Sequence, residues 1–246
     1  MPKMDYYEAD FPVLTRDSDC FSQCQAASLL SFLQETGLAA LAEMGLTRPY
    51  LLERYNAVWM LARVRYTLTW PIHLGDVITV RAWCRSAHGM GLYRDYVILR
   101  DGVQIGEALA LWMLVDAKAR TLLPVSSVPD FHDLVKNPGA KKQQLGRLDL
   151  PEGLVSVNSR TVEYSQADMN GHLNNSRYAD LICDTIGMAR QDGAFISELQ
   201  ISYLSECLPG CVLDMSMLQH GDQRYIRGTG GDGAVRFEAR AELRRP

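Results

Sequence analysis

The feature that most constrains the fold of this chain is an internal repeat. Residues 28–37 (SLLSFLQETG) align with residues 178–187 (YADLICDTIG) at an offset of 150 residues. Both segments carry apolar residues at helical spacing, which is typical of an amphipathic helix packed on a core. A second pair of segments, 65–75 and 200–210, aligns at an offset of 135 residues, and each resembles a strand that ends at a Gly. We therefore expect two copies of one structural plan.

Period-two alternation of apolar residues follows the helix in both copies, which predicts strands. The expected strands cover residues 58–68, 77–86, 92–100 and 103–115 in the first copy, and 199–206, 211–219, 224–228 and 234–243 in the second. Asp101-Gly102 is typical of a hairpin turn between two of them. One helix and several long strands bury their apolar faces best when the sheet curls around the helix. The sequence predicts an α+β fold with a long central helix wrapped by a curved antiparallel β-sheet in each half.

A segment between the copies, residues 129–153, loses this periodicity and collects Pro, Gly, Lys and Gln. Such a composition is typical of a linker. We predict an N-terminal half over residues 1–135, a linker over 136–153 and a C-terminal half over 154–246.

Composition excludes several functional classes. The 246 residues are 47% hydrophobic and 22% charged, with a net charge of −4, so nothing indicates disorder or a nucleic-acid partner. The longest uncharged apolar run, Ala108–Val115, is too short to span a membrane. The acidic start MPKMDYYEAD lacks an apolar signal region, so we expect a cytoplasmic protein. The six cysteines are sparse and lack CxxC spacing, which favours free thiols and no metal site.

One Gly-rich segment imitates a cofactor motif. Residues 228–233 (GTGGDG) match the GxGxxG dinucleotide fingerprint, but an alternating strand pattern follows where the fingerprint requires a helix. We interpret the segment as a hairpin turn and expect no cofactor.

A polar cluster precedes the second helix. Asp168, Asn170 and His172 occupy alternate positions, so in an extended segment their side chains would point the same way. Either Asn174 or Asn175 is a good N-cap, and the helix is expected to run to about residue 189. Its free N–H groups would then lie beside the cluster and could stabilise an anion or an oxyanion.

The first copy lacks these groups. At the offset of 150, Ser18, Cys20 and Ser22 stand where the second copy has the cluster, and Pro71 stands where it has Glu206. We expect one site per chain, built mainly from the second copy.

The run DMNGHLNNSRY, together with SEC before a Pro-Gly turn, resembles the acyl-ACP thioesterases of fatty-acid synthesis in their bacterial form, relatives of the plant enzymes. Residues 112–126 also resemble the family's first half, and the resemblance covers nearly the whole chain. It implies a tandem (double) hotdog fold. It also implies hydrolysis of the thioester between a fatty acyl chain and the phosphopantetheine arm of acyl carrier protein, which would end chain elongation.

The resemblance assigns the catalytic positions to Asp168, Asn170, His172 and Glu206. Cys207 matches a cysteine proposed as a nucleophile in this family. Neighbours on a strand face opposite sides, so only one of Glu206 and Cys207 can meet His172. We interpret Cys207 as a small buried core residue and keep it as the second candidate.

We expect direct attack by water, with either Glu206 or His172 as general base. Asn170 would position the water or the carbonyl, and Asp168 would orient Asn170 or His172. The helix N-terminus at Asn174 and Asn175 would take the oxyanion charge. The sequence leaves open which of the two residues is the base.

The family places the acyl chain between helix and sheet in the first half, where Leu33, Met60 and Leu61 are candidates to line the pocket. The sequence does not define the chain length that the pocket accepts.

Acyl carrier protein is acidic, so it should dock on local cations, for which the candidates are Arg177, Lys141 and Lys142. A monomer suffices physically, and a homodimer is compatible with such folds. Two rival hypotheses are a hotdog acyl-CoA thioesterase and a non-catalytic acyl-binding hotdog protein.

Overall fold

The structure is a computed structural model that describes residues 6–88, 90–133, 144–191 and 193–246. Its residues form two compact units that interleave along the sequence. The first comprises Met1–Phe11, Phe32–Val64 and Val77–Leu145, and the second comprises Pro12–Ser31, Arg65–Asp76 and Gly146–Pro246. These units follow the density of contacts, whereas the division at residues 135 and 154 follows the sequence repeat and stays a prediction.

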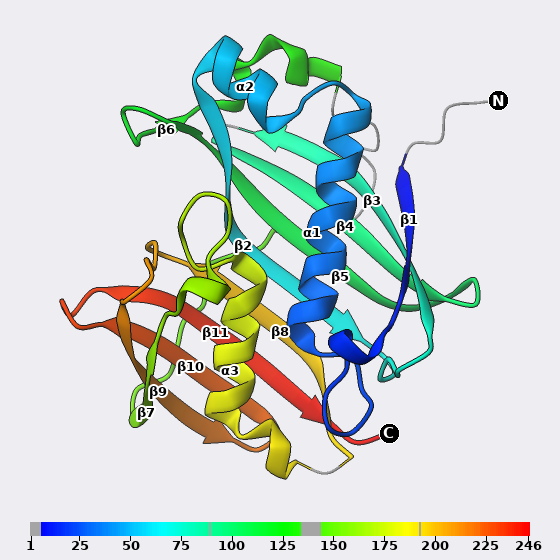
Figure 1. Cartoon of the computed structure of the whole chain (residues 1–246), viewed down its shortest axis with the longest axis vertical. Helices are drawn as coiled ribbons and strands as arrows, with labels where there is room; N and C mark the ends of the chain where they lie inside the picture. Colours follow the sequence, from blue (N-terminus) through cyan, green and yellow to red (C-terminus); the bar gives the residue numbers. More distant parts are fainter. Residues whose placement is uncertain (1–5, 89, 134–143, 192) are drawn as a thin grey trace. The chain divides into compact units, whose positions relative to one another are not determined.

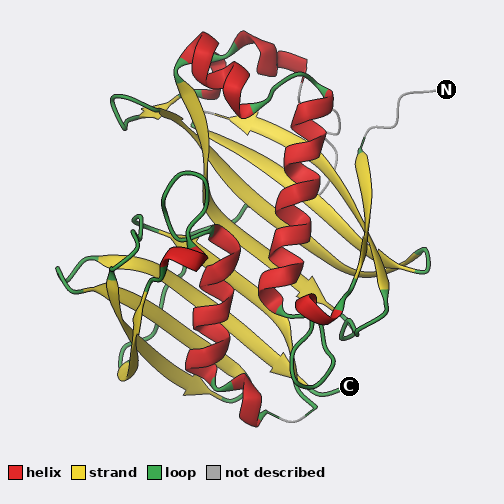
Figure 2. Cartoon of the chain, viewed as in Figure 1, coloured by secondary structure: helices red, strands yellow, loops and turns green. Residues whose placement is uncertain are grey.

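The first unit is built from antiparallel strands and a long helix (Figures 1 and 2). Its strand order is β1-β3-β4-β5-β2, and β6 pairs with β5. The elements are β1 (Tyr7–Pro12), α1 (Ala26–Glu43), α2 (Arg48–Tyr55), β2 (Ala57–Leu68), β3 (Val77–His88), β4 (Gly91–Arg100), β5 (Val103–Asp116) and β6 (Leu122–Leu123). Because α1 and β2 cross the unit boundaries, each also contributes residues to the second unit.

The predicted hairpin between β4 and β5 is confirmed. Asp101 and Gly102 have φ angles of 52° and 75°. Positive φ at both central residues matches the right-handed twist of the flanking strands, and an Asp-Gly pair tolerates it.

The second unit places α3 (Tyr178–Ile186) against an antiparallel sheet, where it packs on β7, β9 and β10. The strand order is β2-β8-β11-β10-β9-β7, and β2 contributes its residues from Arg65 onward to this unit. The remaining strands are β7 (Val155–Thr161), β8 (Phe195–Tyr203), β9 (Val212–His220), β10 (Gln223–Gly230) and β11 (Val235–Arg244). All expected strands of both halves are present. The Gly-rich segment forms the end of β10, up to Gly230, and the turn into β11, so the predicted hairpin is confirmed.

Two predicted ends are wrong. β8 ends at Tyr203 and not at Glu206, because the N–H groups of Leu204 and Ser205 both donate to the carbonyl of Arg236 and the chain leaves the ladder. The helix α3 ends at Ile186 and not near residue 189, because Gly187 has a φ of 73° and caps the last carbonyls.

Sequence patterns also missed four short elements: β1, α2, β6 and β7. β7 carries mainly exposed side chains, so no apolar alternation marks it. α2 begins at a recognisable cap, Thr47 followed by a Pro within the first turn, but spans only 8 residues.

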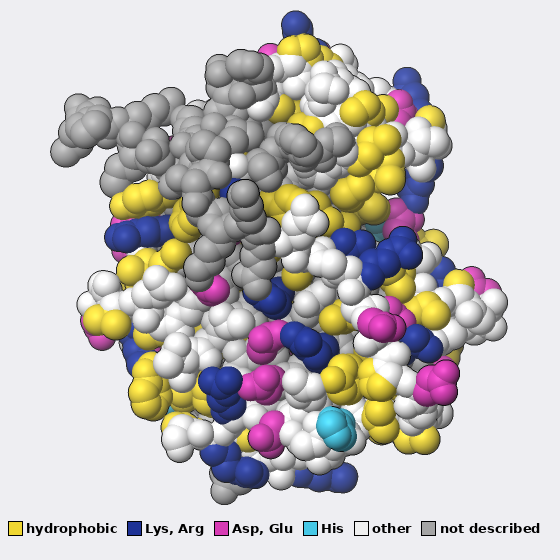
Figure 3. Space-filling model, turned by 180° about the vertical axis from the view of Figure 1, so that it is seen from behind, with side chains coloured by type: hydrophobic (Ala, Val, Ile, Leu, Met, Phe, Trp, Pro, Cys, Tyr) yellow, Lys and Arg dark blue, Asp and Glu magenta, His cyan; other side chains and the backbone are white. Residues whose placement is uncertain are grey.

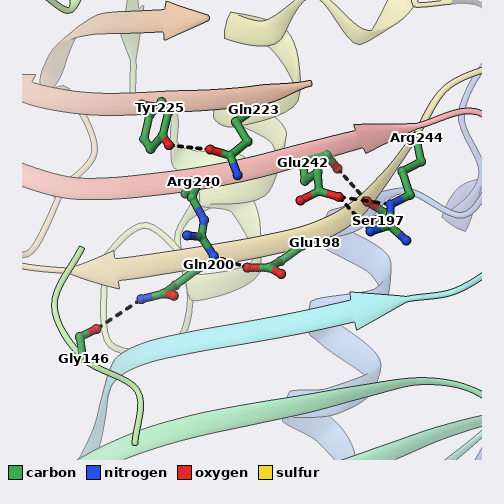
Figure 4. A network of polar contacts seen from close by, with 9 residues as sticks. All are labelled: Gly146, Ser197, Glu198, Gln200, Gln223, Tyr225, Arg240, Glu242 and Arg244. Atoms are coloured by element: carbon green, nitrogen blue, oxygen red, sulfur yellow. Dashed lines mark hydrogen bonds and ion pairs between the residues drawn. The ribbon is translucent and has the colours of Figure 1, made fainter. Parts of the chain in front are cut away.

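Side chains on β8, β10 and β11 of the second unit form polar contacts (Figure 4). Arg240 pairs with Glu198, and Arg244 pairs with Glu242. Gln200 Nε2 donates to the carbonyl of Gly146 at 3.1 Å, which ties the segment before β7 to β8. Seen from behind, basic and acidic side chains of the described residues are interleaved (Figure 3).

Among the described residues, no helix combines the length and the hydropathy that a membrane crossing requires.

Candidate functional site

The polar cluster lies in a tight turn. The N–H of Asp168 donates to the carbonyl of His172 at 2.8 Å, and the N–H of Gly171 donates back to the carbonyl of Asp168 at 2.9 Å. Gly171 has a φ of 77°, a conformation that favours glycine. The segment is therefore not extended, and the prediction that alternation aligns the three side chains is wrong, because the turn decides their directions.

Asp168 fixes Asn170 within this turn. One carboxylate oxygen, Oδ1, accepts the backbone N–H of Asn170 at 2.8 Å, and Oδ2 accepts the side-chain Nδ2 at 3.3 Å. The first contact fixes the backbone of Asn170, and the second restricts the rotation of its side-chain amide. The expected orienting role of Asp168 therefore has a geometric basis toward Asn170.

His172 and Glu206 meet in the second unit. His172 Nε2 lies 3.4 Å from Glu206 Oε2, and their side chains are 26% and 42% exposed. A carboxylate beside an imidazole fixes the orientation of the ring. The backbones of the two segments are also joined, since the N–H of Leu173 donates to the carbonyl of Cys207 at 2.7 Å. The structure thus brings together two residues that are 34 positions apart in the sequence.

Cys207 is fully buried beside this site. Burial raises the pKa of its thiol to about 11, although the Tyr178 hydroxyl donates a hydrogen bond to the sulfur. Glu206 is exposed and Cys207 is buried, so they do face different environments, but they lie in a loop and not on a strand as expected. A thiol that stays protonated at neutral pH is a poor nucleophile.

The helix after the cluster starts at Asn174. Its Oδ1 accepts the backbone N–H and the hydroxyl of Ser176, at 3.0 and 2.9 Å. A 3₁₀ turn, Asn175–Arg177, then leads into α3. Asn174 is therefore the cap, and Asn175 is already inside the first turn. The sequence analysis missed Tyr203, whose hydroxyl donates to the carbonyl of Asn175 at 2.9 Å; its aromatic side chain at a strand end gives no signal of that role.

Hydrogen bonds reveal the true register of the repeat. Thr36 and Thr185 are both buried, and each donates its hydroxyl to the carbonyl four residues earlier at 2.7 Å. They are 149 residues apart. The loops show the same offset. Cys24 N donates to Ile72 O in the first copy and Leu173 N donates to Cys207 O in the second, and the two donors are 149 residues apart. The offset of 150 is therefore wrong by one residue.

The corrected register changes the comparison of the two copies. Asp19 corresponds to Asp168, and its Oδ1 accepts the N–H groups of Phe21 and Gln23, both at 2.9 Å. The expectation that the first copy lacks every polar group of the cluster is thus wrong for the Asp. Phe21 stands in the place of Asn170 and Gln23 in the place of His172.

The residues around Glu206 keep their predicted counterparts. Pro71 stands in its place in the first copy, so that copy has no carboxylate there. Ile72, which is buried, corresponds to Cys207. An apolar counterpart supports a packing role for the Cys207 side chain.

The candidates outside the polar cluster differ in exposure. Leu33 and Leu61 are buried, whereas Met60 is 42% exposed. Arg177 is exposed and pairs with Asp180 at 3.1 Å. Lys141 and Lys142 lie outside the described residues. No three His, Cys, Asp or Glu side chains within the described ranges are placed to hold a metal ion together.

Comparison with known proteins decides the family. The model of the acyl-ACP thioesterase N-terminal domain matches residues 4–132, and that of the C-terminal domain matches residues 154–235. The chain belongs to the acyl-ACP thioesterase family. The helix and the polar cluster of the second copy both lie within the match to the C-terminal domain.

Relatives of this thioesterase-family chain include the chloroplast oleoyl-acyl carrier protein thioesterase 1 of Arabidopsis thaliana. It is 22% identical over 229 residues, which cover 85% of this chain and 62% of the relative. A chloroplast acyl-ACP hydrolase of Cuphea viscosissima is 23% identical over 203 residues, or 48% of its length. The chain therefore spans about half to two thirds of the length of these plant relatives.

Solved structures confirm the fold class. An acyl-ACP thioesterase from Bacteroides thetaiotaomicron superposes with a TM-score of 0.88 at 18% identity, over 98% of both chains. The 12:0-ACP thioesterase from Umbellularia californica gives a TM-score of 0.79 at 18% identity, again over 98% of both chains. The chain has the tandem hotdog fold.

Proposed function

We propose that this protein hydrolyses the thioester of fatty acyl-acyl carrier protein, releases a free fatty acid and so ends chain elongation. The observation that carries the proposal is the 3.4 Å contact between His172 and Glu206, in a member of the acyl-ACP thioesterase family. The first copy has no equivalent of this pair, which supports one reactive site in each chain.

The proposed reaction begins with water. A base removes a proton from the water as its oxygen attacks the thioester carbonyl carbon, which forms a tetrahedral oxyanion. The intermediate then collapses, the C–S bond breaks, and the pantetheine thiolate leaves and takes a proton. His172 and Glu206 together hold and move this proton, because a neighbouring charged group can compensate the change in charge that occurs when a base takes up a proton.

The turn that contains Asp168 supports positioning of the reactants. The side-chain amide of Asn170 donates to Asp168 Oδ2, and the backbone N–H of Asn170 donates to Asp168 Oδ1; held in this way, the amide would orient the water or the carbonyl. Backbone N–H groups at the start of the helix, around Asn174 and Asn175, would stabilise the oxyanion. Rigid donors raise the rate because they need no reorganisation during the reaction.

Water attack is favoured over attack by Cys207. The buried thiol has a pKa of about 11 and its first-copy counterpart is an Ile, which together support a packing role. Cys207 stays the alternative nucleophile, and its substitution decides between the two routes.

The proposed partner is acyl carrier protein, which is acidic. Arg177 is an exposed cation five residues after His172, so it is placed to attract an acidic partner toward the cluster. The acyl chain would occupy the first half, near Leu33, Met60 and Leu61, as the resemblance implies.

The test is an in vitro release assay on a ladder of acyl-ACP substrates, each compared with the acyl-CoA of equal chain length. We expect kcat/KM to be higher for acyl-ACP, and Arg177→Gln to lower kcat/KM for acyl-ACP several-fold while leaving acyl-CoA unaffected. A strong preference for CoA would instead identify an acyl-CoA thioesterase. Lack of hydrolysis of both, with tight acyl binding, would identify a non-catalytic lipid-binding protein.

A further inference from the structure

The second unit contains a cavity of about 840 Å³ that the proposed reaction does not use. It lies between the loop before α1, the end of β2 and the C-terminal half of α3. None of Asp168, Asn170, His172 and Glu206 lines it. Its volume falls in the range of roughly 300–1,000 Å³ that is typical of small-molecule sites.

The repeat explains why a cavity exists here. Residues 19–25, which form one wall, correspond to residues 168–174, the loop of the polar cluster. Gln23 and Phe21 replace His172 and Asn170 in this copy. The cavity is therefore placed against the counterpart of the reactive loop, but it lacks the groups that would hydrolyse a ligand.

The inner wall of the cavity is largely apolar and carries no charged side chain. Most of its buried residues are apolar, namely Leu29, Tyr66, Leu68, Ile72, Ile186, Phe195 and Ile196, and the two buried polar residues, Gln23 and Thr185, carry no charge. Burial raises the pKa values of the Cys24 and Cys183 thiols to about 12 each, so both stay neutral at physiological pH. A wall of this kind accepts a hydrocarbon chain and disfavours a charged group.

The acidic residues of the cavity are already engaged. Asp184 pairs with Arg160 at 3.3 Å, and Asp180 pairs with Arg177 at 3.1 Å. Asp19 accepts two backbone N–H groups of its own loop. Their negative charges are thus partly compensated inside the protein.

One basic residue lines the cavity. Arg190 is the sole Lys or Arg among the residues that line the cavity; it is exposed and forms no ion pair within the described part of the chain. It lies at the end of the 3₁₀ turn Met188–Arg190 that follows α3. A guanidinium beside an apolar cavity matches a ligand with a hydrocarbon chain and a carboxylate.

We propose that this cavity is a second site that binds a free fatty acid, with the hydrocarbon chain on the apolar wall and the carboxylate at Arg190. The hydrocarbon chain of the ligand would lie beside the first-copy counterpart of the reactive loop, in a space that is large enough for a lipid and has no catalytic groups. The ligand is held and not converted. The proposal does not depend on hydrolysis, because no residue of the polar cluster contributes to the cavity.

The test uses decanoate and 1-decanol, which share a chain length and differ in charge. Isothermal titration measures their affinities for the wild type and for three variants: Ala26→Phe, which fills the cavity from the first residue of α1; Arg190→Gln; and Arg147→Gln, an exposed arginine of the same unit that does not line the cavity. We expect Ala26→Phe to weaken the binding of both ligands about tenfold or more. Arg190→Gln should weaken decanoate alone, by about two- to fivefold, and Arg147→Gln should change neither.

Photolabelling locates the ligand even if Ala26→Phe does not fold. A decanoate with a diazirine at its terminal carbon should label peptides from residues 19–29 and 183–196 of the wild-type chain. Labelling confined to other segments would overturn the proposal. So would a folded Ala26→Phe variant that binds both ligands like the wild type, or an Arg190→Gln variant that leaves decanoate affinity unchanged, which would indicate an uncharged ligand.

Discussion

Replacing Cys207 with Ala separates the two chemical routes. Its side chain is fully buried, accepts a hydrogen bond from the Tyr178 hydroxyl and has a thiol pKa raised by burial to about 11. At pH 7.5, a pKa of about 11 leaves about one thiol in 3,000 ionised. A mechanism through water does not need this sulfur, so Cys207→Ala should keep kcat within about threefold of the wild type.

The same substitution should lower stability. Loss of one buried heavy atom costs about 1 kcal/mol, comparable to an Ile→Val change in a core. The Tyr178 hydroxyl loses its acceptor, which costs about 1 kcal/mol more. A total of about 2 kcal/mol lowers the melting temperature by about 4–8 °C in a chain of this size. Cys207→Ser keeps an acceptor for Tyr178, so its loss of stability should be smaller.

The assay measures initial rates of acyl-ACP hydrolysis between pH 6 and 10, with calorimetry on each variant. For attack by the thiolate, the wild-type rate would rise about tenfold per pH unit toward pH 11, in step with ionisation. A folded Cys207→Ala variant without activity, or a wild-type profile of that slope, would refute water attack and return the nucleophilic role to Cys207.

Three further predictions concern the turn and the repeat. Gly171→Ala should lower the free energy of unfolding by about 1 kcal/mol because of its positive φ alone, since a Cβ there meets no atom. Gly231→Ala is the control: Gly231 is also exposed and open but has no positive φ, so the loss should be far smaller, and thermal melts of both variants measure the difference. Thr36→Val and Thr185→Val each remove an equivalent buried hydrogen bond and should lower the melting temperature by similar amounts, about 2–4 °C; unequal shifts would argue against the register of 149. Asn170→Ala should reduce kcat about 100-fold or more without changing the melting temperature, and retention of activity would remove Asn170 from the site.

The long strands and the two helices could be predicted because their signal is distributed. Apolar patterning over ten or more residues, alternating in much of β2 and β4 and continuous at the centre of β5, survives the loss of any one position, and the resulting antiparallel fold is confirmed. β7 has mostly exposed side chains and α2 is a single short helix, so neither carries enough apolar pattern to be recognised.

The register of the repeat could not be decided by apolar pattern. Leu29 and Leu33 both offer apolar partners at an offset of either 149 or 150, because a helix stripe is broad. Only single polar residues distinguish the two, and the deciding pair is Thr36 and Thr185, which both donate to the carbonyl one turn earlier. Their role is visible from hydrogen bonds and not from hydropathy.

The candidate site was predictable in composition and not in geometry. The motif and the missing counterparts in the first copy single out His172 and Glu206. Their proximity depends on a turn closed by Gly171 and on the early end of β8, and both are local hydrogen-bonding events that periodicity does not report. Strand alternation correctly predicted that Glu206 and Cys207 have different environments. The reason was wrong, because both residues lie in a loop and not on a strand.

A double-mutant cycle on His172 and Glu206 tests the central claim most directly. The measured quantity is kcat for acyl-ACP hydrolysis by His172→Ala, Glu206→Gln and the double variant, each with an unchanged melting temperature. If the two side chains act as one unit across their 3.4 Å contact, each single change should abolish most of the activity and the double variant should be no slower than the worse single one. Losses that multiply, or a folded His172→Ala variant with wild-type kcat, would contradict the account.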